Sequence, residues 1–280
     1  MASTKAAIKK HSDMTDPFTE KKPQRMAMLI DGDNAQPNLI VKLLAEVGKY
    51  GPITIRRIYG DWTTPQMNGW KDCLNNHAIQ PIQQFRYTVG KNATDSALII
   101  DAMDLLHSGL VDGFCIVSSD SDYTRLATRI RESGNFVMGI GQRKTPKPFV
   151  NACNIFIYTE NLTETIDDQK IAVADKNTPG GQENPRPNPV PMLKEAYSMA
   201  VGEDSWAHLG TMGMALRQLD PAFDPRTFGY SQLIQLIKAH KDLFTIRKED
   251  DKGSSAVYIQ RKASKPTTSG RARKPKQNKP

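Results

Sequence analysis

The sequence predicts an α/β protein with a parallel sheet that has helices on both faces, followed by a small winged-helix domain. Over residues 25–162, short apolar runs alternate strictly with stretches of helical periodicity, which is typical of a parallel sheet. Residues 163–188 contain one Asp pair, two adjacent glycines and several prolines, a composition that indicates a linker. Residues 189–262 show three helical stretches and then two strand-like runs, the order of a winged helix.

The first domain contains six short apolar runs that predict strands and four stretches of helical periodicity. The third strand has Pro81 near its start, which favours an edge position because proline cannot donate a ladder hydrogen bond. The predicted strands cover 26–31, 53–59, 79–85, 113–118, 136–140 and 155–158, and the predicted helices cover 36–48, 65–76, 94–107 and 121–133.

The second domain is expected to contain three helices and a terminal hairpin. A polar turn at 249–253 separates the two hairpin strands. The aromatic residues of this domain, Trp206, Phe223, Phe228 and Tyr230, are expected to lie mainly in its core. The predicted helices cover 190–200, 206–219 and 231–238, and the predicted strands cover 243–246 and 256–259.

The bulk composition indicates a cytoplasmic protein without a membrane segment. Hydrophobic residues make up 38% of the chain and charged residues 24%, which is ordinary for a soluble protein. No apolar run approaches the roughly 20 residues of a membrane span, and residues 1–24 are polar and expected to be disordered. The three cysteines are widely spaced. The simplest interpretation is that they are buried thiols in a protein of a reducing compartment.

The net charge of +8 is concentrated at the C-terminal end of the chain. Residues 261–280 contain eight Lys and Arg residues and no acid, so residues 1–260 sum to zero. We expect residues 263–280 to form a disordered basic tail. Such a tail is suited to tethering nucleic acid or acidic lipid, and the alternative is an end that only adds solubility.

Acidic residues follow the strands at one edge of the predicted sheet. Asp31 and Asp33, with Asn34 beside them, end the first strand, and Asp120 and Asp122 follow the fourth. The carboxyl ends of parallel strands share one edge, where such sheets bind ligands. A buried carboxylate must be paired, hydrogen-bonded or bound to a metal.

Asp95 lies in the first turn of the helix predicted at 94–107. The residues three, four and seven positions after it are apolar and share its helix face, so Asp95 lies at the start of the apolar face. We therefore expect Asp95 to face the core and join the other acids. The alternative is an acid that complements the helix dipole, with Thr94 as the N-cap. For Asp122, the alternative is a cap of the following helix.

Clustered carboxylates without His or Cys are suited to Mg²⁺ or Mn²⁺, and such ions activate phosphodiesters for hydrolysis. The surrounding loops and helix faces are basic, as expected for binding a polyanion, although such residues also occur on ordinary solvated faces. The candidate RNA-binding residues are Arg86, Lys91, Arg125, Arg129, Arg143 and Lys144.

Three segments, 29–34 (LIDGDN), 91–95 (KNATD) and 117–123 (VSSDSDY), together resemble the LabA-like branch of the NYN domain family. The resemblance implies a PIN-like, Rossmann-type fold whose acids bind Mg²⁺ or Mn²⁺ and cleave RNA. It implies that the metal-binding, catalytic acids are Asp31, Asp95, Asp120 and Asp122, with Asn34 and Asp33 as supporting groups. Members of this branch often have Gly where this chain has Ser119.

Residues 216–219, with 223–231 (FDPRTFGYS) and the leucines Leu233 and Leu236, are similar to the OST-HTH (LOTUS) domain. The resemblance implies a winged helix that binds RNA, including structured or G-rich RNA. Taken together, the two resemblances predict a metal-dependent ribonuclease with a C-terminal RNA-binding module.

Two alternatives remain open from the sequence. The first is a catalytically weak or inactive protein that binds RNA as an adaptor. The second is a haloacid-dehalogenase-like phosphatase, because Asp31-Gly32-Asp33 resembles the D-x-D pair of that family, although Ala35 stands where it has Thr or Val. A dinucleotide-binding enzyme is disfavoured because the first turn lacks the G-x-G-x-x-G pattern.

Overall fold

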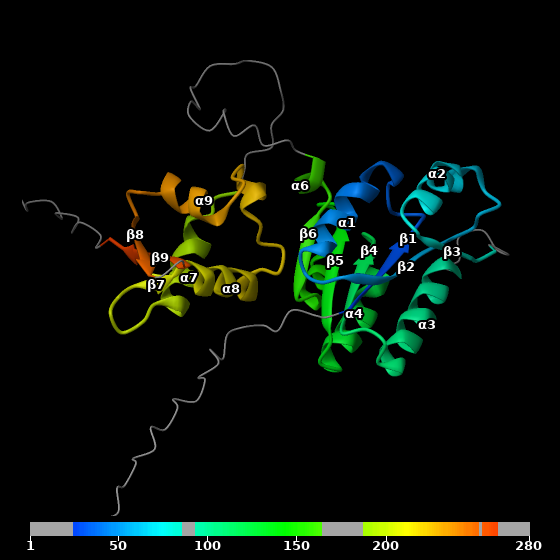
Figure 1. The fold of residues 1–280 in the computed structure, drawn as a ribbon, viewed down its shortest axis with the longest axis horizontal. Coiled ribbons are helices and arrows are strands. Elements are labelled where there is room, and N and C mark those ends of the chain that lie inside the picture. The colour runs from blue at the N-terminus through cyan, green and yellow to red at the C-terminus, as the bar shows by residue number, and fades with distance from the viewer. Residues whose placement is uncertain (1–24, 86–92, 164–186, 252–253, 263–280) are drawn as a thin grey trace, which may run out of the picture.

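The computed structural model describes residues 25–85, 93–163, 187–251 and 254–262. The first domain contains a six-stranded sheet in the order β3-β2-β1-β4-β5-β6 (Figure 1). All five strand pairs are parallel, as predicted, and the proline-containing strand β3 lies at an edge. The strands are β1 (Met26–Asp31), β2 (Ile53–Gly60), β3 (Gln80–Gln83), β4 (Gly113–Val117), β5 (Phe136–Gly141) and β6 (Ile155–Tyr158).

Helices cover both faces of this sheet. Side chains of α1 (Ile40–Gly48) and α2 (Asn68–Asn76) pack against one face. Side chains of α3 (Ala93–Ser108), α4 (Thr124–Glu132) and α5 (Lys147–Ala152) pack against the other. The short helix α6 (Glu160–Thr163) follows β6.

Two details of the helices differ from the sequence prediction. The predicted starts at 36, 65 and 121 correspond to short 3₁₀ turns at η1 (Pro37–Leu39), η2 (Pro65–Met67) and η3 (Ser121–Tyr123). Helix α5 was not predicted, because its six residues are too few to show a helical period.

The strand order places a topological switch point between β1 and β4. From β1 the chain moves outward to β2 and β3, and then crosses back to β4 on the other side of β1. Every residue of β1 is buried, and its side chains alternate between the two hydrophobic cores. Loops that leave β1 and β4 therefore diverge from neighbouring strand ends, where open α/β sheets bind ligands.

The second domain is a small helical unit with a three-stranded antiparallel sheet in the order β7-β9-β8. The predicted helix at 206–219 begins only at Leu209, because Ala207 and His208 pair with β9 instead. The hairpin strands are longer than predicted, and Glu249–Asp251 continues β8 instead of forming the turn. The elements are α7 (Val190–Ala200), β7 (Ala207–His208), α8 (Leu209–Leu219), η5 (Pro225–Phe228), α9 (Leu233–Ala239), β8 (Phe244–Asp251) and β9 (Ser254–Arg261).

Some predictions concern residues that the structure does not describe. The disordered N-terminus at 1–24, most of the linker at 163–188 and the basic tail at 263–280 lie outside the described residues. Among the helices in the described part of the chain, none is both long and apolar enough to cross a membrane.

The second domain contacts the first along strand β6, through the segment between α8 and α9. The Phe156 amide on β6 donates a hydrogen bond of 2.9 Å to the carbonyl of Pro221. Ala222 is buried in the same hydrophobic core as Phe156. The Asn161 amide donates a bond of 3.0 Å to the Thr227 hydroxyl. The segment thereby covers an edge strand that would otherwise present unpaired backbone groups.

A buried cluster of charged side chains fixes this contact on the opposite face of the sheet. Arg226 donates hydrogen bonds of 3.0 and 3.2 Å to Glu46 on α1, and also bonds to Asp224 beside it. The side chains of Glu46 and Asp224 are only 6% and 7% exposed. Burial alone lowers the pKa of Arg226, but its bonds to the two carboxylates outweigh this effect and raise it.

We predict that Arg226→Ala uncouples the two domains, because it leaves two buried carboxylates without their shared cation. Breaking a buried pair in this way costs about 3 kcal/mol. Differential scanning calorimetry should show a lower unfolding midpoint and separate transitions for the two domains. Arg261→Ala removes an exposed arginine and serves as the control. If Arg226→Ala and Arg261→Ala unfold alike, the cluster does not hold the domains together.

Candidate metal centre

Asp31 is the buried anchor of the site at the end of β1. Its side chain is fully buried, and it accepts hydrogen bonds from the Asn34 amide at 2.7 Å and the Ser118 hydroxyl at 2.9 Å. The backbone amide of Asp33 donates a third bond at 3.1 Å. Burial raises the pKa of Asp31, and these three bonds offset the increase only in part. Asp31 thus connects the loop after β1 to the end of β4.

The loop after β4 presents Asp120 and Asp122. The hydroxyl of Ser118, which donates to Asp31, also accepts a bond of 3.1 Å from the Asp120 amide. The Asp120 carboxylate caps η3 by accepting a bond of 2.9 Å from the Asp122 amide. Asp122 itself is exposed in the first turn of η3. Asp120, and not Asp122, therefore caps the turn, and the Asp122 carboxylate is not needed for that purpose.

Asp95 lies in the first turn of α3 and is 9% exposed. Its carboxylate accepts a hydrogen bond of 2.6 Å from the hydroxyl of Tyr123, which is fully buried. Thr94 also lies inside α3, and its hydroxyl donates to the Asp33 carboxylate at 3.1 Å. Thr94 is therefore used to connect α3 to the loop after β1, and it does not precede the helix as an N-cap.

Asp95, Asp120 and Asp122 each offer a carboxylate oxygen, and the three oxygens lie within 4.8 Å of one another. Burial raises the pKa of Asp95, as do the negative charges of Asp31, Asp120 and Asp122, while the bond from Tyr123 opposes the shift. Grouped carboxylate oxygens fit a hard divalent cation, and such a cation would relieve their mutual repulsion. The donor set therefore fits a divalent metal.

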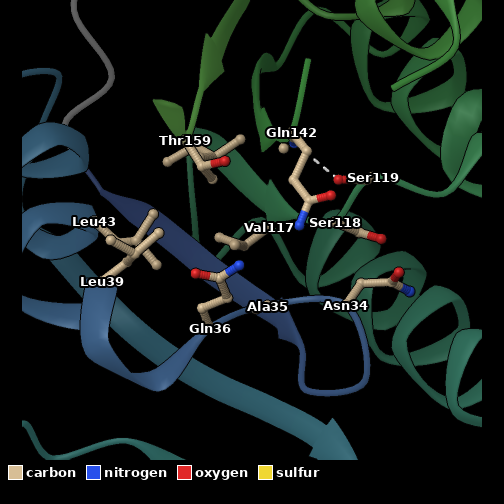
Figure 2. A pocket seen from close by; sticks show the side chains of 12 residues that line it. Asn34, Ala35, Gln36, Leu39, Leu43, Val117, Ser118, Ser119, Gln142 and Thr159 are labelled. Atoms are coloured by element: carbon tan, nitrogen blue, oxygen red, sulfur yellow. Dashed lines mark hydrogen bonds between the residues drawn. The ribbon is translucent and has the colours of Figure 1, made fainter. Parts of the chain in front are cut away.

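Backbones approach closely around these loops. A Cβ on Gly32 would lie 2.8 Å from the Tyr59 carbonyl, and one on Gly141 would lie 2.5 Å from the Ser118 carbonyl. The hydroxyl of Ser119 accepts a bond of 2.8 Å from the Gln142 amide. Ser119 therefore connects the loop after β4 to the loop after β5, and this contact accounts for its side chain (Figure 2).

A small pocket lies beside the acids, between the loops that follow β1, β4 and β5. Figure 2 shows Gln36 and Gln142 extending into it from opposite sides, with Asn34 on the side of the first loop. Its polar lining consists of neutral amides and hydroxyls, so it differs in chemistry from the acidic group next to it.

The predicted basic residues have different surroundings. Arg86 and Lys91 lie outside the described residues. Arg125 and Arg129 are exposed on α4, and Arg129 lies 3.9 Å from Glu132. Lys144 is exposed after β5. The guanidinium of Arg143 bonds to Asn161 at 3.1 Å and lies 5.8 Å from the centre of the Tyr158 ring, so it faces β6 and the second domain.

The chain matches two domain families. Residues 25–163 match the NYN domain, and residues 184–256 match the OST-HTH/LOTUS domain. The chain contains an NYN domain followed by a LOTUS domain. NYN domains are PIN-like nuclease domains, which use divalent metals, and LOTUS domains bind RNA. These matches support a nuclease with an RNA-binding module, and the group of three Asp residues lies within the NYN domain.

Two solved structures are similar to parts of this NYN–LOTUS chain. One is a Vibrio parahaemolyticus protein of unknown function, with 16% identity, covering 48% of this chain and 92% of the other, at a TM-score of 0.41. The other is an uncharacterized Nitrosomonas europaea protein, with 30% identity, covering 37% of this chain and 99% of the other, at a TM-score of 0.29. No curated protein matches the chain significantly.

The contacts of three site residues could not be predicted from the sequence. Ser118 joins Asp31 to the Asp120 amide, Tyr123 holds Asp95, and Thr94 holds Asp33. Ser118 and Tyr123 lie within the 117–123 segment that carries the NYN resemblance. Their spacing from Asp120 was visible in the sequence, but which acid each would contact depends on how β1, β4 and α3 are arranged.

We predict that Asp95→Asn makes the metal-free protein more stable at neutral pH. The folded-state pKa of Asp95 is raised above 3.8, the ordinary value for an aspartate, so ionisation costs more in the folded than in the unfolded state. Stability is therefore lost as the pH rises from 3.8 to the raised pKa. Urea unfolding in EDTA across this range should show the stability difference between Asp95→Asn and the wild type growing with pH. A difference that does not change with pH would contradict the electrostatic explanation.

Proposed function

We propose that the protein is a ribonuclease that uses Mg²⁺ or Mn²⁺ to hydrolyse RNA phosphodiesters, with its LOTUS domain binding the substrate. The observation that carries this proposal is the group of carboxylate oxygens from Asp95, Asp120 and Asp122 at the switch point of an NYN fold. RNA as the substrate is supported by the LOTUS domain on the same chain. We further propose that it prefers structured or G-rich RNA and acts in the cytoplasm.

In this proposal, the carboxylates of Asp95, Asp120 and Asp122 hold the metal. Asp31 is a fourth candidate ligand, and its buried side chain also fixes Ser118 and Asn34 beside the site. A bound divalent ion would polarise the phosphoryl group and promote attack by water. Tyr123 orients Asp95 through its 2.6 Å bond, and Ser118 sets the start of the loop that carries Asp120.

The structure argues against a phosphatase that uses Asp31 as its nucleophile. Such a nucleophile must reach the phosphorus atom with one free carboxylate oxygen. The Asp31 side chain is fully buried, and both of its oxygens accept hydrogen bonds. A measurable rate with a small aryl phosphate would nevertheless favour the phosphatase.

An RNA-binding adaptor with an inactive nuclease domain is the remaining alternative. It requires the LOTUS domain to bind RNA while the acids do no chemistry. The pKa values of Asp31 and Asp95 are raised by burial, so the site is electrostatically strained without a cation. Retaining such a group of acids is easier to explain if a metal binds there.

We predict that Asp120→Asn abolishes metal-dependent cleavage of a labelled structured RNA. The substitution removes one of three grouped carboxylates and should lower the rate by at least about 100-fold, which corresponds to about 3 kcal/mol in the barrier. Cleavage is measured with Mn²⁺, with Mg²⁺ and with EDTA. Asp104→Asn is the matched control, because Asp104 is an exposed acid on the same chain segment as Asp95, helix α3.

The outcomes of this assay separate the alternatives. Cleavage that requires metal, persists in Asp104→Asn and is lost in folded Asp120→Asn would support the nuclease. RNA that is bound but uncut with every metal would contradict the nuclease and favour the adaptor. Equal cleavage by wild type and Asp120→Asn would point to a contaminating nuclease.

We also propose that the basic tail at 263–280 adds salt-sensitive affinity for RNA. It contains six Lys and Arg residues and no acid. Deleting it should reduce the slope of log affinity against log salt by as much as about 4, because each phosphate contact on single-stranded RNA contributes about 0.7. Fluorescence anisotropy over a salt series measures the slope. An unchanged slope would mean that the tail does not contact the RNA.

A further inference from the structure

A cleft of about 300 Å³ lies between the two domains, next to strand β6. One wall comes from the NYN domain, where Arg143, Lys147 and Tyr158 line it. The other wall comes from the LOTUS domain, with Phe223 and Phe228 among its lining residues. A volume of this size is at the lower limit of small-ligand sites and is sufficient for a nucleobase with part of its ribose.

The lining combines positive charge with aromatic rings. Arg143 and Lys147 are exposed, and the Arg143 guanidinium lies 5.8 Å from the centre of the Tyr158 ring. Phe223 and Phe228 form a pair with ring centres 5.8 Å apart. Aromatic rings stack on bases of any identity, and cations track the phosphates, which is how proteins bind single-stranded nucleic acid.

Polar groups complete the lining. Asp220 lies 3.8 Å from the Lys147 ammonium and accepts a bond of 2.9 Å from the Ala222 amide. Thr227 bonds to Asn161, and Asn188 lies at the start of the LOTUS domain. A hydroxyl, an amide and a carboxylate thus lie near the rings, where they could contact base edges or a ribose.

The cleft continues the edge of the sheet that carries the acids. Gln142 and Thr159 line the small pocket beside the acids (Figure 2). Their chain neighbours Arg143 and Tyr158 line the interdomain cleft. The carboxyl ends of β5 and β6 therefore connect the two cavities, and an extended strand that follows this edge passes from the acids to the LOTUS domain.

The contact between the domains holds the two walls of the cleft at a fixed separation. The bond from Phe156 to Pro221, the bond from Asn161 to Thr227 and the Arg226 cluster all involve the segment that carries Phe223 and Phe228. Neither wall alone places cations opposite the phenylalanine pair. The cleft is therefore a property of the docked domains, which lie against each other along β6 (Figure 1).

We propose that this cleft binds one nucleotide of a single-stranded RNA segment whose neighbouring part reaches the metal centre. The base stacks against the aromatic rings, and Arg143 and Lys147 contact the adjoining phosphates. The proposal rests on RNA being the ligand of this protein, as the proposed function states. It adds a subsite built jointly by the two domains.

The test measures RNA binding without cleavage. Full-length protein carrying Asp120→Asn is titrated in EDTA, at physiological salt, against a short fluorescein-labelled single-stranded RNA. Arg143→Glu and Lys147→Glu should each weaken binding about tenfold, because a phosphate contact becomes a repulsion. Lys71→Glu is the control and makes the same charge change at an exposed residue of α2. This helix packs near the opposite edge of the sheet (Figure 1). Lys71→Glu should therefore change the affinity less than about twofold.

A second measurement does not depend on these substitutions. RNA containing 4-thiouridine is photo-crosslinked to the same Asp120→Asn protein, and the modified peptides are identified by mass spectrometry. Crosslinks at Tyr158, Phe223 or Phe228 are expected. Crosslinks found only elsewhere, or equal loss of affinity in Lys71→Glu and Arg143→Glu, would overturn the proposal. The crosslinking assay needs no catalysis. Crosslinks in the cleft of Asp120→Asn, combined with no Mn²⁺-dependent cleavage by the wild-type protein, would overturn the nuclease and leave the subsite in place.

Discussion

The burial of carboxylates at and around Asp31 is the constraint on which the rest of the site depends. Asp31 ends a strand in which every residue is buried, so its charge has almost no access to water. Burial raises the pKa of Asp95, and the charges of Asp31, Asp120 and Asp122 add to this increase. A fold can keep such charges together only if each is hydrogen-bonded or balanced by a cation. Three donors to Asp31 and one to Asp95 supply part of this compensation.

Those donors come from elements on both sides of the switch point, and this explains how the loops are held. Ser118 belongs to the end of β4 and Asn34 to the loop after β1, so Asp31 joins the two strand ends that the topology places side by side. Tyr123 and Thr94 connect η3 and α3 to the same group. Asp31, Asp33 and Asp95 therefore each have a separate structural partner that fixes the position of the carboxylate.

The sequence was sufficient for the parallel sheet, because strand and helix periods are local patterns. Apolar runs that end in Asp indicated strand ends such as β1, and alternation with helices indicated a parallel sheet. The supporting contacts could not be predicted in the same way. Tyr123 and Asp95 are far apart in the sequence, and their 2.6 Å bond exists because α3 and η3 meet over one core. The helix predicted at 206–219 includes the two residues of strand β7, because two residues carry no recognisable period and only pairing with β9 defines them.

The interface between the domains could not be predicted from the sequence, for a related reason. Phe223 and Phe228 were expected in the LOTUS core, and they do pack against it, yet they also face the NYN domain across the cleft. The sequence pattern of a half-buried aromatic residue is the same whether its exposed side contacts water or another domain. Arg226 is similar, since pairing with the neighbouring Asp224 is a local matter, whereas pairing with Glu46 requires α1 to lie beside it.

The contact between the domains along β6 also bears on how a protein with a group of acids can bind RNA. A group of carboxylates repels the phosphates that it must approach, so affinity for a polyanion has to come from elsewhere. Arg143 and Lys147, which line the interdomain cleft, lie where the sheet edge meets the LOTUS wall and not among the acids. The positive charges that would attract phosphates therefore lie apart from the acids, at the side of the sheet where β5 and β6 are found. In the proposed function, an extended RNA strand would gain its binding energy at the cleft and bring a neighbouring phosphodiester to the acids, where a bound divalent cation would reverse the local charge.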